Sequence, residues 1–120
     1  MEKPHKKLDV WKESIEFVVI IYNLVRKFPH SEEFVLTPQL KRAVISIPAN
    51  IAEGAARHSK REFIQFLYIA RGSMSEVDTY LEIALRLGII TREMVSGIEP
   101  QMTRIDKMLT GLIQFLKKRS

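Results

Sequence analysis

Two short runs place polar groups inside otherwise apolar, helix-like sequence. They read Ser46-Ile47-Pro48-Ala49-Asn50-Ile51-Ala52-Glu53-Gly54 and Ile69-Ala70-Arg71-Gly72-Ser73-Met74-Ser75-Glu76. A helix that only filled a core would carry Leu or Ala at these places, so the runs predict two halves of one helix–helix contact. A buried carboxylate without a partner is costly, and we expect a structural polar network of Ser46, Asn50, Glu53, Arg71, Ser73 and Glu76. A ligand or catalytic site at the same residues is the alternative. Gly54 and Gly72 would allow the two backbones to approach closely there.

Other residues that could do chemistry do not complete a catalytic pattern. A di-iron bundle needs two Glu-x-x-His motifs, and the chain does not contain two. Glu13 and Glu16 resemble one half of the magnesium site of all-α nucleotide pyrophosphatases, but Glu76 and Asp78 have the wrong spacing for the other half. The chain has no cysteine, which excludes disulfides, thiolate metal ligands and a cysteine nucleophile. We therefore expect no enzymatic activity, no cofactor and no metal.

Basic clusters are the remaining functional signal. They comprise Arg57, Lys60 and Arg61, then Arg104 and Lys107, and finally Lys117, Lys118 and Arg119. No aromatic residue is interleaved with them, so we expect contacts with nucleic-acid phosphates, without base stacking or sequence preference. Cations at the end of a helix also complement its dipole, and this alternative is sufficient for the last cluster taken alone.

Composition limits the classes of protein to consider. The chain has 120 residues, 46% of them hydrophobic and 28% charged, which fits one folded domain spanning residues 1–120. Its net charge is +5, a modest excess that favours polyanionic partners. No segment has the pattern of a signal peptide or the length of a membrane span, so we expect a cytoplasmic protein with no membrane partner.

Four segments, 8–28, 38–57, 60–87 and 92–118, repeat apolar residues at helical spacing. Thr37-Pro38 predicts an N-cap followed by proline in the first turn. Ser59 and Glu62 predict a capping box, and Gly88 predicts a helix C-terminus. Pro48 falls inside the second segment and predicts a bend there rather than a break. The expected fold is an all-α, antiparallel, up-down-up-down four-helix bundle.

The first and third segments are apolar along more than one stripe. The first segment has one stripe of Leu8, Trp11, Ile15, Val18, Tyr22 and Val25, beside another of Val10, Phe17, Ile21 and Leu24. The third segment likewise continues its second stripe through Ile69, Ile83 and Leu87. Each helix of an isolated bundle needs only one buried face, so the surplus predicts self-association. A monomer with some exposed aliphatic residues is the alternative.

The polar runs also resemble a known family. The pattern Ser46-Ile47-Pro48-x-Asn50-Ile51-Ala52-Glu53-Gly54-x-x-Arg57, then Ala70-x-Gly72-Ser73-x-x-Glu76, is similar to the small four-helix-bundle proteins encoded in intervening sequences of bacterial 23S ribosomal RNA genes. Related bundles include the accessory variability determinant of diversity-generating retroelements. The resemblance implies a homo-oligomer, pentameric in members of solved fold. The retroelement relative further implies a basic ring that binds nucleic acid and its reverse transcriptase.

Two functions follow as expectations. The first is a non-enzymatic homo-oligomer, a pentamer by the resemblance, which binds RNA or DNA through phosphate contacts. The second is a protein-interaction scaffold that has a protein partner, such as a reverse transcriptase, and no direct role with nucleic acid.

Overall fold

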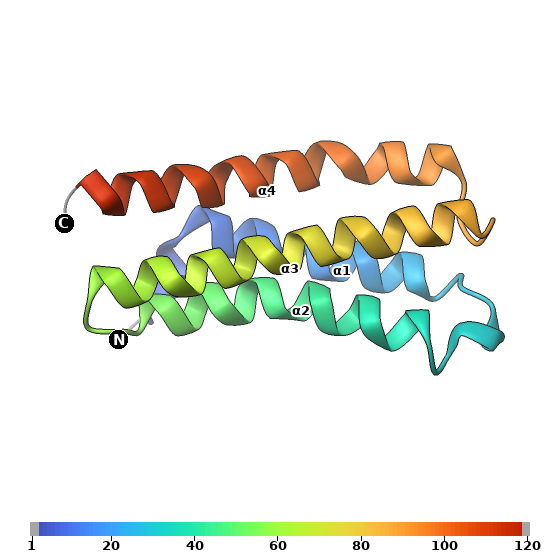
Figure 1. The fold of residues 1–120 in the computed structure, drawn as a ribbon, viewed down its shortest axis with the longest axis horizontal. Helices are drawn as coiled ribbons and strands as arrows, with labels where there is room; N and C mark the ends of the chain where they lie inside the picture. The colour runs from blue at the N-terminus through green and yellow to red at the C-terminus, as the bar shows by residue number, and fades with distance from the viewer. Residues whose placement is uncertain (1–2, 119–120) are drawn as a thin grey trace.

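Four antiparallel helices form the molecule in the computed structural model, which describes residues 3–118 (Figure 1). They are α1 (Asp9–Val25), α2 (Leu36–Ala55), α3 (Lys60–Arg86) and α4 (Arg92–Lys118). Two short 3₁₀ turns, η1 (Pro4–Lys7) and η2 (His30–Glu32), precede α1 and α2. Each helix contacts the next along the chain and α1 also contacts α4, so the helices follow one another around the bundle. The predicted up-down-up-down bundle is confirmed.

The helices differ in length, and this decides which surfaces are covered. The helices α3 and α4 each have 27 residues, whereas α1 has 17. The most extensive contact joins α2 to α3, and the contact of α1 with α4 is much smaller. One end of α4 therefore has α3 as its main neighbour.

Local chemistry sets the boundaries of α3 as the sequence predicts. The Ser59 Oγ accepts a hydrogen bond from the Glu62 backbone N–H at 3.2 Å and begins the helix. At the other end, Gly88 has a φ of +76°. The N–H groups of Gly88 and Ile89 donate to the carbonyls of Leu85 and Ala84, which is the Schellman pattern of a helix C-terminus. That conformation favours glycine at residue 88, because glycine has no Cβ to strain it.

The beginning of α2 and the end of α1 differ from the sequence expectation. The Thr37–Pro38 N-cap is wrong, because α2 begins at Leu36 and no side chain caps it. Leu36 is buried in the core, and Pro38 is tolerated because N–H groups in the first helical turn have no intrahelical partner. The helix α1 ends at Val25 rather than 28. Pro29 disfavours helical geometry at Phe28, the residue before it. The helix α2 is unbroken at Pro48, and the bend expected there stays a prediction.

The core lies between the four inward faces. Its largest fully buried side chains are Phe17, Ile21, Leu40, Ile47, Ile51, Leu67, Leu81, Ile105, Leu109 and Ile113. On α1 the stripe through Phe17 and Ile21 is buried, whereas Ile15 of the other stripe is exposed. No helix in residues 3–118 is both long and apolar enough to span a bilayer.

Candidate nucleic-acid interface

One end of the bundle collects basic residues that are far apart in the sequence. The α2–α3 connection, the end of α4 and the beginning of the chain all lie at this end (Figure 1). The described cations there are Lys3, Lys6, Lys7, Arg57, Lys60, Arg61, Lys117 and Lys118. The nearby carboxylates of the described chain are those of Asp9, Glu53 and Glu62, so positive charge is in excess. We call this surface the basic end. Arg119, which the sequence analysis grouped with Lys117 and Lys118, lies outside the described residues.

The predicted cations at the basic end differ in how they are held. The Arg57 guanidinium lies 2.9 Å from a Glu53 carboxylate oxygen and 3.9 Å from one of Glu62, which links the end of α2 to the beginning of α3. It also lies 4.9 Å from the centre of the Phe66 ring. The charge of Arg57 is thus largely balanced within the molecule. Arg61 and Lys118 are exposed and form no ion pair with any described residue.

Arg104 and Lys107 do not belong to the basic end. Lys107 precedes Lys117 by ten residues of α4, which separates them by about 15 Å along the helix axis. The Arg104 Nε lies 3.0 Å from a Glu13 carboxylate oxygen on α1. Arg104 therefore joins α4 to α1 through an ion pair, while Lys107 is exposed on the outer side of α4.

A tyrosine that the sequence analysis missed lies among these cations. The Lys117 Nζ donates a hydrogen bond of 2.6 Å to the Tyr68 hydroxyl, and the Arg71 guanidinium carbon lies 5.6 Å from the Tyr68 ring centre. No aromatic is interleaved with the basic clusters in sequence, but the fold brings Tyr68 beside Lys117. The expectation of no base stacking therefore loses its basis. Tyr68 and Lys117 are 49 residues apart in sequence, and the antiparallel fold brings them together. The order of the helices could have indicated this contact, because antiparallel packing places the beginning of α3 beside the end of α4.

The polar runs form a smaller network than the sequence predicts. The Asn50 Nδ2 donates to the Ser46 carbonyl and to the Ser46 Oγ, both at 2.8 Å. The Ser73 hydroxyl, which is buried on α3, donates to the same Ser46 Oγ at 2.8 Å. These three side chains join α2 to α3 across their interface.

The charged members expected in that network lie outside it. Glu53 and Glu76 are exposed, so neither is the buried carboxylate that the sequence suggested. Glu53 pairs with Arg57, four residues later and just beyond the end of α2, and Arg71 lies against Tyr68 instead. Helical spacing placed these residues near the contact but could not tell on which side of it they project.

The two glycines of the polar runs differ as well. A Cβ built on Gly54 would lie 2.8 Å from the Phe66 Cβ and 3.2 Å from the Phe63 carbonyl oxygen. Gly54 therefore permits the close approach of α2 to α3 that the sequence predicts. A Cβ on Gly72 would meet nothing within 4 Å, so the same prediction is wrong for Gly72.

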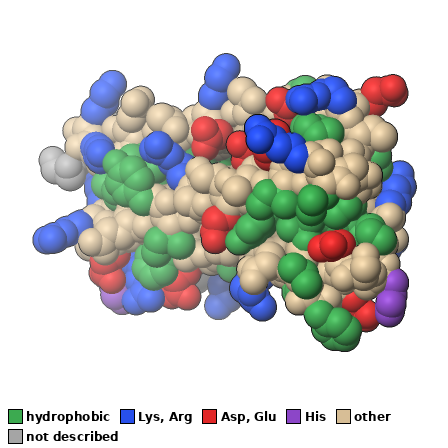
Figure 2. All heavy atoms as spheres, turned by 45° about the vertical axis from the view of Figure 1, so that its right-hand side comes forward, with side chains coloured by type: hydrophobic (Ala, Val, Ile, Leu, Met, Phe, Trp, Pro, Cys, Tyr) green, Lys and Arg blue, Asp and Glu red, His purple; other side chains and the backbone are tan. Residues whose placement is uncertain are grey.

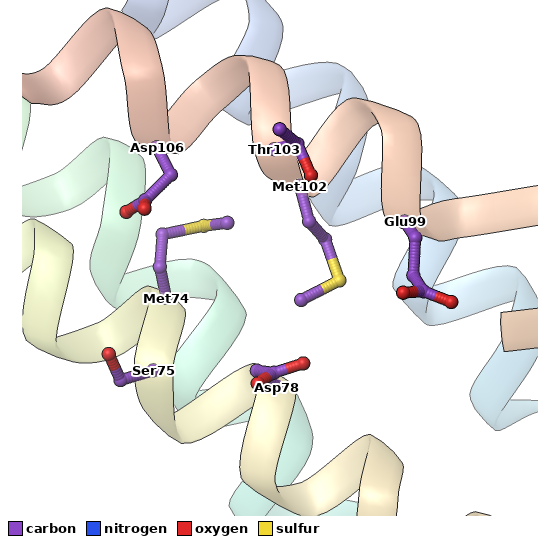
Figure 3. Close-up of a pocket in the computed structure, with 7 residues that line it drawn as sticks. All are labelled: Met74, Ser75, Asp78, Glu99, Met102, Thr103 and Asp106. Atoms are coloured by element: carbon purple, nitrogen blue, oxygen red, sulfur yellow. The ribbon is translucent and has the colours of Figure 1, made fainter. Parts of the chain in front are cut away.

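An acidic groove lies between α3 and α4 beyond the basic end. It has a volume of about 220 Å³ and is lined by Met74, Ser75, Asp78, Glu99, Met102, Thr103 and Asp106 (Figure 3). The carboxylates of Asp78 on α3 and Glu99 on α4 both extend into the space between the helices (Figure 3). Residues 3–118 contain no group of three or more His, Asp or Glu arranged to hold a metal. Negative charge along this flank disfavours the binding of polyanions there.

Comparison with known proteins places the chain in a family. Residues 6–111 match the model of the 23S rRNA-intervening sequence protein family. The fold is similar to the crystal structure of a protein of unknown function from the S23 ribosomal protein family of Bacteroides thetaiotaomicron. The two share 37% identity over 87% of this chain and 97% of that chain, with a TM-score of 0.80. No match was found among curated proteins, and the relation to the retroelement protein stays a prediction. On its sequence match and its fold, the chain belongs to the 23S rRNA-intervening sequence protein family.

Proposed function

We propose that the protein is a non-enzymatic homo-oligomer that binds RNA or DNA phosphates at its basic end, without sequence preference. The observation that supports this function is the convergence of cations from three separate parts of the sequence on one end of the bundle. They are Lys3, Lys6 and Lys7, then Arg57, Lys60 and Arg61, and finally Lys117 and Lys118. Lysine and arginine neutralise phosphates and release counterions whatever the base sequence. Arg61 and Lys118 suit this role because they are exposed and form no ion pair with a described residue.

Two exposed apolar faces support the homo-oligomer. The first, the α1–α2 face, exposes Ile15 (39%), Val19 (55%) and Ile45 (44%), beside a shallow groove that reaches Tyr22 and Arg26. The second, the α3 face, exposes Ile69, Ile83 and Leu87 along the outer side of α3. Figure 2 shows hydrophobic side chains gathering toward the end of the molecule that carries the α1–α2 and α3–α4 connections. Faces of this kind mark contacts with other proteins.

The charged side chains of the two apolar faces favour a second copy of the chain as the partner that covers them. Arg26 and Lys41 border the α1–α2 face, where the Lys41 Nζ lies 5.2 Å from the Tyr22 ring centre. Glu76, on the same stripe of α3 as Ile69 and Ile83, is exposed, whereas Glu82 pairs with Arg86 at 2.8 Å. The α1–α2 face is therefore bordered by cations and the α3 face contains the carboxylate of Glu76, which gives the two faces opposite charge. A contact between unlike faces is head-to-tail, so it closes into a ring or extends as a filament.

A closed ring strengthens phosphate binding. Five copies, the number that the family resemblance implies, would carry a net charge of +25 if each keeps its +5. Each copy would also contribute its own basic end, so that one long nucleic acid contacts several copies and gains avidity.

Light scattering tests the assembly. We expect one species with a mass several times the 13.9 kDa of the chain. Val19→Glu should reduce that mass by placing a carboxylate in the α1–α2 face. Gln114→Glu, at an exposed position of α4, should not. A single species of monomer mass at micromolar concentration would contradict the homo-oligomer.

The salt dependence of binding tests the ligand and its position. Each phosphate contact steepens the fall of log affinity with log salt by about 0.9 on duplex DNA. Arg61→Glu with Lys118→Glu should flatten this slope by nearly two such contacts. Lys27→Glu with Arg92→Glu makes the same charge change at the opposite end and should leave the slope unchanged. If the wild-type protein binds neither RNA nor DNA at low salt, the protein-interaction scaffold is the better function.

A further inference from the structure

We propose, on the basis of the proposed function, that Tyr68 stacks on an unpaired base and makes the protein prefer single-stranded nucleic acid over duplex. Tyr68 lies beside the basic end on the outer side of α3 and is 43% exposed. Its neighbours Arg71 and Lys117 come from α3 and from the last turn of α4. Single-strand sites in other proteins combine an exposed aromatic ring with nearby cations, because the ring stacks on a base while the cations contact phosphates.

The two neighbouring cations do not cover both faces of the Tyr68 ring. The Lys117 Nζ lies 2.6 Å from the hydroxyl and 5.2 Å from the ring centre. The second distance is close to the largest that a hydrogen bond of this length to the hydroxyl permits. The ammonium therefore lies beyond the hydroxyl edge, near the plane of the ring, and covers neither face. Arg71, 5.6 Å from the ring centre, can cover one face at most.

The hydrogen bond also holds the ring in place. Because Lys117 on α4 donates to the hydroxyl of Tyr68 on α3, the ring is restrained before any ligand arrives. A restrained aromatic loses less conformational freedom on binding. The pair of Phe66 and Arg57, at the same end, does not offer the same surface, since Phe66 is only partly exposed and Arg57 lies against it.

Stacking distinguishes single strands from duplexes. In a duplex the bases are already stacked and paired, so only their phosphates reach the basic end. An unpaired base can leave its neighbours and lie on the Tyr68 ring, and the loss of one such contact costs about tenfold in affinity. The phosphate contacts of the proposed function bind single strands and duplexes alike, whereas the Tyr68 contact adds affinity only for single strands.

The test compares an oligothymidylate of about 12 nucleotides, within the range of single-strand footprints, with a duplex of mixed sequence and equal length. Both are titrated at the same low salt. We expect Tyr68→Leu, which removes the ring, to weaken oligothymidylate binding about tenfold while duplex binding is unchanged. Tyr68→Phe keeps the ring and should retain most of the affinity for the oligothymidylate. Phe34→Ala removes an aromatic that is 87% exposed at the opposite end and should change neither affinity.

The outcomes separate this inference from the proposed function. Unchanged duplex binding by Tyr68→Leu shows that the variant folds and that the basic end is intact. If Tyr68→Leu binds both ligands as the wild type does, the stacking site is wrong and the phosphate-binding function stands. If Tyr68→Leu weakens both ligands equally, Tyr68 does not distinguish them and the inference is also wrong. Failure of the wild type to bind either ligand would refute the proposed function itself.

Discussion

Gly54→Ala offers a sharp test of how α2 and α3 are packed. The new Cβ would lie 2.8 Å from the Phe66 Cβ and 3.2 Å from the Phe63 carbonyl oxygen, whereas ordinary contact begins at 3.4 Å. The Phe63 oxygen is part of the α3 backbone and the Phe66 Cβ is bonded directly to it. A rotamer change therefore cannot relieve these two close contacts. The helices must separate by several tenths of an ångström along their most extensive contact.

The expected magnitude follows from two opposing effects. Alanine favours a helix interior over glycine by at most about 1 kcal/mol. Overpacking a well-packed contact costs about 1–3 kcal/mol. We expect Gly54→Ala to lower the free energy of unfolding by about 1–2 kcal/mol. Gly111→Ala is the matched control, because a Cβ there meets nothing within 4 Å. It should raise the free energy of unfolding by about 0.5–1 kcal/mol.

Urea unfolding followed by circular dichroism measures both variants. All samples need the same protein concentration, because the proposed self-association would make the apparent stability depend on concentration. The two alanines should move the unfolding midpoint in opposite directions. A Gly54→Ala variant at least as stable as the wild type would refute the close approach of α2 to α3.

Two further substitutions separate the polar network from the charged residues near it. Ser46→Ala should lower the free energy of unfolding by about 1 kcal/mol, because the Asn50 amide and the Ser73 hydroxyl lose their shared acceptor. The loss stays modest since both donors retain a backbone carbonyl partner; a neutral result in urea unfolding would count against the network. Glu76→Ala should change the free energy of unfolding by less than about 0.5 kcal/mol, because the side chain is exposed. A loss of several kcal/mol would restore the buried carboxylate that the sequence suggested.

Local chemistry made much of the fold predictable. The capping box at Ser59 and the C-terminal signal at Gly88 act through hydrogen bonds between residues only a few positions apart. Such bonds can be inferred without knowing what packs against the helix. The beginning of α2 was mispredicted for the opposite reason. There the burial of Leu36 in the core decides the boundary, and the local Thr37–Pro38 signal does not.

The candidate site was predictable only in part. The sequence identified the basic clusters, and the antiparallel order of helices explains why those of residues 57–61 and 117–118 share an end. It could not show that Arg57 and Arg104 are engaged in ion pairs, because their partners are chosen by side-chain packing. Tyr68 was missed because its partner Lys117 comes from another helix.

The sequence by itself determined that the chain forms four helices and that α2 and α3 meet through small and polar residues. Helical periodicity carries this information, since it assigns each residue to a stripe. The tertiary structure decided which neighbour each stripe meets. In the fold Gly54 lies against Phe66, whereas a Cβ on Gly72 would meet nothing within 4 Å. Ser73 donates a hydrogen bond to Ser46, whereas Glu76 is exposed to solvent. Periodicity fixes the angle of a side chain around its own helix, and only the packing of the other helices determines what lies in that direction.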